Sequence, residues 1–193
     1  MSRERADATR NRAVLVATAR EMLAEAGIDK LTMDALAERS GLGKGTVFRR
    51  FGTRAGIFQA LLDESERAFQ ERVISGPPPL GPGAEPLDRL VEFGRARIRF
   101  LLENRKIARA ALDGRTPLPL GPPAAMTQMH IRVLLRQMSL SAGDLDVLAM
   151  QLTAALDVPL LLYLPLDGTG PPEEATEDRL SRGWEDLIRR VCR

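Results

Sequence analysis

Proline is distributed very unevenly along this chain, and that distribution limits the folds open to it. All 13 prolines lie at or after Pro77, so the first 76 of the 193 residues contain none. Proline disrupts helix interiors because it lacks a backbone N–H and clashes with the preceding turn. A long proline-free stretch with apolar residues at helical spacing therefore predicts several helices joined by tight turns.

The rest of the chain is divided by clusters of proline and glycine. Three such clusters are present, at 76–86, 114–123 and 165–172. Apolar residues recur with a helical period in the segments between them, over about 85–113, 124–140, 142–164 and 173–192. No alternating strand pattern and no Asn-Gly hairpin signal is found. The sequence predicts an all-α fold of about nine helices.

The chemistry-bearing residue types exclude most kinds of enzyme. The chain has one cysteine, Cys192, and one histidine, His130, so it offers neither an internal disulfide nor a zinc ligand set. No nucleophile–base pair and no phosphate-binding glycine loop is apparent. The acidic pairs 173–174 and 185–186 are helix neighbours about 100° apart, so neither converges as a catalytic dyad. We therefore expect no enzyme activity, no metal and no cofactor.

Two features of the sequence indicate the cellular location of the protein. The first twenty residues are rich in arginine and acidic residues, which excludes a signal peptide there. The most apolar run, 158–164, is too short to span a bilayer and contains Pro159. These features predict a cytoplasmic protein with no membrane partner.

A formal net charge of only +2 conceals a local excess of positive charge. The stretch 39–62 has no acidic residue and five basic ones, Arg39, Lys44, Arg49, Arg50 and Arg54. A basic cluster on a small helical unit is the electrostatic pattern expected for contact with phosphates. A solvated surface with no such partner is the alternative that charge alone leaves open.

The spacing around this cluster favours DNA. A helix over 10–26 ends at Gly27, and Thr32 is the expected N-cap of a two-turn helix that reaches Arg39. The turn 40–43 follows, with Gly41 free to adopt a positive φ. A third short helix runs from Lys44 to Phe51. Two short helices joined by a glycine turn, the second basic on its outer face, indicate a helix-turn-helix.

These residues resemble the DNA-binding domain of the TetR (tetracycline-repressor) family. The resemblance covers residues 19–62 without a gap, at Gly27, Thr32, Ala37, Gly41, Lys44, Gly45, Thr46, Phe48, Arg49, Phe51, Thr53 and Arg54. Three positions depart from the family pattern. Phe48 replaces the usual tyrosine and loses its hydroxyl, Arg50 stands where histidine is frequent, and Gly43 replaces a frequent serine.

The resemblance implies roles for individual side chains. Thr32, Gly45, Thr46, Thr53 and Arg54 are expected at phosphates. Lys44 and Arg49 are expected to read guanine edges in the major groove, with Phe48 and Arg50 on the same surface. An arginine-rich tail before residue 13 would follow the DNA backbone or the minor groove, unless it is merely a disordered terminus. Retention of the motif for packing alone is the alternative.

The resemblance also implies two domains. Residues 1–53 would comprise the N-terminal arm and the DNA-binding domain, with the motif at about 32–51. Residues 54–193 would form a helical domain for ligand binding and dimerisation, and the helix over 53–74 would transmit ligand binding to the DNA-binding domain.

Six residues are predicted to contact a ligand, namely Phe93, Arg97, Met126, Met129, His130 and Gln151. Arg97 shares a side of its helix with Phe93 and Phe100, so it could meet an anionic ligand in a cavity. An ion-paired or snorkelling arginine is the alternative. Methionines suit an adaptable pocket and an ordinary core equally well, and His130 could equally be a core histidine.

A homodimer is expected, because the two DNA-binding domains of a dimer can reach successive major grooves, which lie 34–36 Å apart or a multiple of that distance. The family forms an intersubunit four-helix bundle. The predicted interface residues are Leu152, Leu156, Tyr163, Trp184, Leu187 and Val191, with Trp184 as the anchor. Together these features predict a repressor that a small molecule releases from a palindromic operator. The alternative is a dimeric protein-interaction module that no longer binds DNA.

Overall fold

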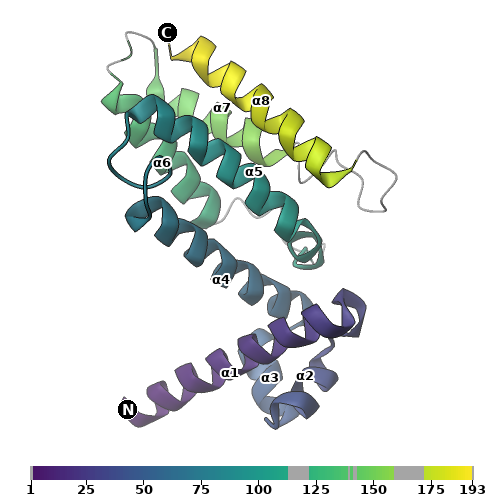
Figure 1. The fold of residues 1–193 in the computed structure, drawn as a ribbon. Helices are drawn as coiled ribbons and strands as arrows, with labels where there is room; N and C mark the ends of the chain where they lie inside the picture. Colours follow the sequence, from purple (N-terminus) through teal and green to yellow (C-terminus); the bar gives the residue numbers. More distant parts are fainter. Residues whose placement is uncertain (1, 113–121, 139, 141–142, 159–171, 193) are drawn as a thin grey trace. The chain divides into compact units, whose positions relative to one another are not determined.

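The computed structural model describes residues 2–112, 122–138, 140, 143–158 and 172–192. Within these residues it contains eight α-helices, one 3₁₀ helix and no β-strand (Figure 1). The prediction of an all-α fold is confirmed. The chain divides into two compact units, one comprising the residues up to Ser65 together with the segment that begins at Lys106, and the other the remainder. The domain boundary expected after residue 53 stays a prediction.

The first unit is a small helical bundle. Its helices are α1 (Ser2–Ala26), the 3₁₀ helix η1 (Ile28–Lys30), α2 (Met33–Ser40), α3 (Lys44–Phe51) and the first half of α4 (Arg54–Ser75). Leu15, Leu36, Val47 and Phe58, one from each α-helix, are fully buried in one hydrophobic core. The predicted first helix began at residue 10, but α1 begins at Ser2, so the arginine-rich tail is helical.

The second unit contains the second half of α4 and four further helices. These are α5 (Pro86–Ala110), which belongs to this unit up to Arg105, α6 (Pro122–Gln137), α7 (Leu145–Val158) and α8 (Glu173–Val191). Helix α7 begins where Asp144 accepts hydrogen bonds from the backbone N–H groups of Asp146 and Val147, at 2.9 and 3.2 Å. The kink predicted at Pro159 lies outside the described residues.

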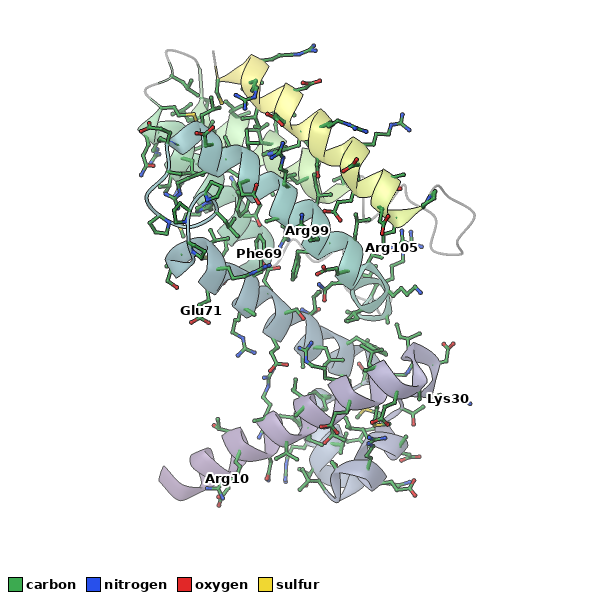
Figure 2. The ribbon with its side chains drawn as sticks, in the orientation of Figure 1. Arg10, Lys30, Phe69, Glu71, Arg99 and Arg105 are labelled. Atoms are coloured by element: carbon green, nitrogen blue, oxygen red, sulfur yellow. The ribbon has the colours of Figure 1, made fainter. Side chains whose placement is uncertain are left out.

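Helix α8 is fixed against α5 by a tryptophan that rests on a glycine. Trp184 is 4% exposed, and its indole N–H donates to the carbonyl oxygen of Leu90, 3.1 Å away. A Cβ built at Gly94 would overlap the Trp184 ring, so only glycine leaves room for it. Arg99 and Arg105 of α5, labelled in Figure 2, add ion pairs to Glu177 and Glu173 of α8.

Among the described residues, no helix combines the length and the hydropathy needed to cross a membrane.

Substituting Gly94→Ala should destabilise the protein, because the new methyl group displaces Trp184. Overpacking of this kind costs about 1–3 kcal/mol of unfolding free energy. The control is Glu103→Ala, at an exposed position of the same helix. There the unfolding free energy should change by less than about 0.5 kcal/mol, because exposed substitutions away from specific contacts have small effects. Urea unfolding at fixed protein concentration measures both. A Gly94→Ala protein as stable as wild type would contradict this packing.

Candidate nucleic-acid interface and ligand cavity

The turn between α2 and α3 has the geometry that the sequence predicts. The Thr32 hydroxyl accepts a hydrogen bond from the backbone N–H of Ala35 at 3.1 Å, which caps α2. Gly41 ends the helix in the left-handed region at φ 68°, a conformation that favours glycine. Leu42 is half-buried and packs against the core. Helix α3 therefore leaves the turn in a fixed direction.

Helix α3 presents nearly all of its surface outward. Val47 is its one buried residue, and Phe51, one turn later, is partly buried in the same core. Lys44, Gly45, Arg49 and Arg50 are exposed, and so is Phe48, at 51%. Thr46 is half-buried. An exposed, basic, eight-residue helix behind a glycine turn is the arrangement that reads a DNA groove in helix-turn-helix proteins.

Two of the five basic residues, Arg39 and Arg54, are engaged by groups within the protein, which limits their availability to DNA. Arg39 forms a two-pronged ion pair with Glu25 of α1, at 2.6 and 2.7 Å. Hydrogen bonding from Arg39 lowers the pKa of Glu25. Arg54 donates to the carbonyl oxygens of Leu31, at 2.7 Å, and of Ile28.

Arg54, which the sequence places at a phosphate, thus also has partners within the protein. Its guanidinium group also lies 5.0 Å from the ring centre of Phe58. With two donors on carbonyl oxygens, it stabilises the connection between α1 and α2, and only its remaining N–H groups are left for a phosphate. Thr53 likewise accepts a hydrogen bond from the backbone N–H of Gly56 at 3.1 Å, so its hydroxyl caps the start of α4.

The other three basic residues are better placed for DNA. Lys44 pairs with Asp34 at 2.8 Å, but both side chains are about two-thirds exposed, so the pair is weak and easily exchanged. Arg50 donates to the carbonyl oxygen of Ala8 in α1 at 2.8 Å. Arg49 is exposed and has no side-chain partner within the described part of the chain. Arg49 is thus the strongest candidate for base contact.

The second unit contains a cavity of about 130 Å³. Its lining residues are Glu66, Phe69, Gln70, Val73, Ile74, Phe93, Met126, Thr127, Met129, His130 and Val133. The structure thus brings together four of the six predicted ligand residues, Phe93, Met126, Met129 and His130. Gln151 is exposed on α7 and does not line this cavity, and neither does Arg97.

His130 contributes a buried polar atom to this cavity. Its ring lies 4.7 Å from the ring of Phe93, centre to centre. Its Nε2 atom is buried and has no hydrogen-bond partner in the described structure. Burial, reinforced by the charge of Arg89, lowers the pKa of His130 to about 4. The imidazole is therefore neutral near pH 7, with one nitrogen that donates and one that accepts.

Arg97 is an ion-paired arginine and does not offer a free charge to a ligand. Its side chain is 5% exposed and lies between two carboxylates, with Nη1 2.7 Å from Glu66 Oε2 and Nε 3.3 Å from Asp157 Oδ1. The rings of Phe69 and Phe100 flank the guanidinium at 5.7 and 5.1 Å. Burial raises the pKa of Asp157, although Arg97 opposes this effect. The alternative that the sequence left open is the one the structure supports.

Five of the lining residues come from α4, a helix that was expected to transmit ligand binding but on which no ligand-contacting residue was predicted. They are Glu66, Phe69, Gln70, Val73 and Ile74. Phe69 is buried, whereas Glu71 is exposed and points outward (Figure 2). The sequence contains one pattern that could have identified them. Phe69 and Val73 are spaced i, i+4 and therefore mark the inward side of α4.

The predicted dimer residues lie mostly inside their own unit. Leu152, Leu156 and Trp184 are at most 4% exposed, so Trp184 is not the interface anchor that the sequence suggested. Leu187 is 37% exposed and Val191 is half-buried. Tyr163 lies outside the described residues. Sequence reasoning missed an exposed stripe on α7, formed by Val147, Met150, Ala154 and Val158.

Comparisons with known proteins agree with this geometry. The family model for "Bacterial regulatory proteins, tetR family" matches residues 15–61. A "DNA-binding transcriptional repressor TetR" of Mycobacteroides abscessus is 33% identical over 62 residues, which are 32% of this chain. The matched region spans a third of the length of that curated relative.

Solved structures show the same fold over nearly the whole chain. A TetR-family transcriptional regulator from Pectobacterium atrosepticum has a TM-score of 0.73 at 22% identity, covering 97% of this chain and 96% of that one. A TetR variant from Acinetobacter baumannii, solved with minocycline, has a TM-score of 0.64 at 20% identity and covers 90% and 92%.

The fold and the exposed α3 helix define a helix-turn-helix protein with a second helical unit. The match over α1 to α4 narrows that class further. Residues 15–61 match the DNA-binding region of the TetR family of bacterial regulatory proteins, and the chain has the fold of solved TetR-family structures.

Acid should weaken the fold partly through His130. Its pKa falls from 6.5 to about 4 on folding, so between these values the unfolded chain binds the proton more readily. The stability that the neutral imidazole provides is complete above pH 6.5 and lost as the pH falls towards 4. From pH 7 to pH 4.5, wild type should lose about 2 kcal/mol more than His130→Phe does.

Urea unfolding at both pH values, at fixed protein concentration, measures this difference. Gln137→Phe, which introduces the same residue at an exposed site of α6, should show the wild-type pH dependence. Equal acid sensitivity in wild type and His130→Phe would contradict the burial of a neutral imidazole.

Proposed function

We propose that this protein is a sequence-specific DNA-binding transcriptional regulator, most simply a repressor, that acts in the cytoplasm as a homodimer. The observation that carries the proposal is α3, an exposed basic helix held by Val47 and the Gly41 turn, on which Arg49 pairs with none of the described residues. In this proposal Lys44 and Arg49 contact base edges. Thr32, Gly45, Thr46 and Thr53 contact phosphates, with Phe48 and Arg50 beside them.

We further propose that residues 1–53 are the DNA-binding domain and that the remainder senses a small molecule. Helix α4 supports a link between DNA binding and ligand sensing, because one continuous helix from Arg54 to Ser75 contributes to both units. Its first half buries Ile57, Phe58 and Leu61 in the core of the first unit, and its second half lines the cavity. A ligand that favours one position of α4 would change DNA affinity, provided that it binds the two states unequally.

The proposed homodimer rests on two apolar stripes that the described chain leaves uncovered. On α7 they are Val147, Met150, Ala154 and Val158, spaced three or four residues apart. On α8, Leu180, Gly183, Leu187 and Val191 repeat at the same spacing and are exposed or half-buried. Two neighbouring helices of this kind in each subunit would complete a four-helix bundle.

Substituting Arg49→Ala should weaken specific binding by about 1–3 kcal/mol and relax the preference at one base pair. Thr46→Val, which removes only a hydroxyl, should weaken binding to all sequences about equally. Fluorescence anisotropy with DNA from beside the protein's own gene, against scrambled DNA, measures both changes.

Arg182→Ala is the matched control, because Arg182 is exposed on α8 and should leave DNA affinity unchanged. A folded wild-type dimer that does not prefer its own DNA at low salt would contradict the regulator and support a module that only binds protein.

Replacing Met150→Asp or Leu187→Asp should dissociate the dimer, because each would place an unpaired charge in an apolar interface. The shift should be at least tenfold in the dimer dissociation constant, measured by analytical ultracentrifugation. Val14→Asp is the control, since Val14 is an exposed apolar residue of α1, at 42%. Dimers that tolerate both substitutions would place the interface elsewhere.

A further inference from the structure

We infer that the cavity of the second unit takes a small, uncharged molecule with one aromatic ring and one hydroxyl group, that is, a simple phenol, whose hydroxyl bonds to His130 Nε2. This inference rests on the proposed function, in which that cavity is the ligand site, and it names the chemical class of the ligand.

The size of the cavity sets the first limit. At about 130 Å³ it is close to the roughly 150 Å³ apolar cavity known to admit benzene. The walls are largely apolar and include the rings of Phe69 and Phe93, whose centres are 5.8 Å apart. Aromatic rings pack favourably against one another in offset or edge-to-face arrangements, so these walls favour a guest that is itself aromatic. A single ring fits both the volume and the walls.

The charges around the cavity exclude an ionic ligand. Among the described lining residues Glu66 is the one carboxylate, and both of its oxygens are in use. Oε2 accepts from Arg97 Nη1 at 2.7 Å, and Oε1 accepts from Gln70 Nε2 at 3.4 Å. A carboxylate guest would meet the like charge of Glu66, and none of the described lining residues is a cation, because Arg89, whose charge acts on His130, does not line the cavity. A cationic guest would find no unpaired anionic oxygen there and would lie near the guanidinium of Arg97.

Among the described lining residues, one fully buried polar atom has no hydrogen-bond partner, and it selects the functional group. A buried polar atom without a partner costs free energy, so a ligand that supplies the partner recovers that free energy on binding. His130 Nε2 is such an atom. A neutral imidazole nitrogen either donates or accepts, and a hydroxyl group can do both. A hydroxyl therefore complements His130 in either tautomer, whereas a methyl group complements it in neither.

The experiment compares phenol, toluene and benzoate, which share one ring and differ in the substituent. Isothermal titration of the full-length wild-type protein, free of DNA, should show phenol binding at least tenfold more tightly than toluene and benzoate not binding. This comparison uses wild-type protein alone, so it does not depend on the folding of any variant. Equal affinities for phenol and toluene, binding of benzoate as tight as phenol, or no phenol binding would each overturn the inference.

Two variants assign the preference to His130. In His130→Phe a phenyl ring replaces the imidazole opposite Phe93 and the nitrogen is lost, so phenol should bind no better than toluene. Gln137→Phe, exposed on the same helix and outside the cavity, should keep the wild-type preference. A His130→Phe protein that still prefers phenol tenfold would place the hydroxyl contact elsewhere and overturn the inference.

The binding experiments distinguish an error in the proposed ligand class from an error in the proposed regulatory function. Protein that binds phenol but no DNA selectively would contradict the proposed regulator and leave the ligand class standing. Protein that binds its own DNA but not phenol would contradict the ligand class alone.

Discussion

Helix α3 is anchored by a single fully buried side chain, Val47, with Phe51 partly buried one turn later. A helix of eight residues is too short to be stable in isolation, so its existence and its direction both depend on that packing. The Gly41 turn and the Thr32 cap of α2 fix how the chain enters it. With one side held inward, the remaining positions are presented outward as a rigid set. Every proposed DNA contact of α3 follows from this constraint.

The second unit is organised around a different constraint, a buried positive charge. Arg97 of α5 has to be compensated, and the carboxylates of Glu66 on α4 and Asp157 on α7 do so. Removing one partner would leave an unpaired buried charge, which is strongly destabilising. Glu66 also lines the cavity, so the same contact that joins three helices borders the proposed ligand site. A guest that shifts α4 would act on this network as well as on the cavity walls.

Much of the fold followed from local signals, whereas the partners of single side chains did not. The Thr32 cap, the Gly41 turn and the inward side of α3 were predicted, because each depends on residues within a few positions. Phe93, Met126, Met129 and His130 were each predicted as ligand residues from side-chain type and helix face, and all four line one cavity. Arg97 could not be assigned, since its partners lie 31 and 60 residues away. Trp184 was misjudged for the same reason: its carbonyl partner on α5 is 94 residues distant.

The central claim is that α3 reads a DNA sequence from a symmetric pair of subunits. Selection of bound DNA from a random-sequence pool, followed by footprinting of the enriched sequences, tests this claim most directly. The account predicts an inverted repeat whose half-sites are one helical turn apart, or a multiple of it, and whose enrichment is lost with Arg49→Ala. A folded dimer that enriches no motif, or only a non-repeated one, would contradict it.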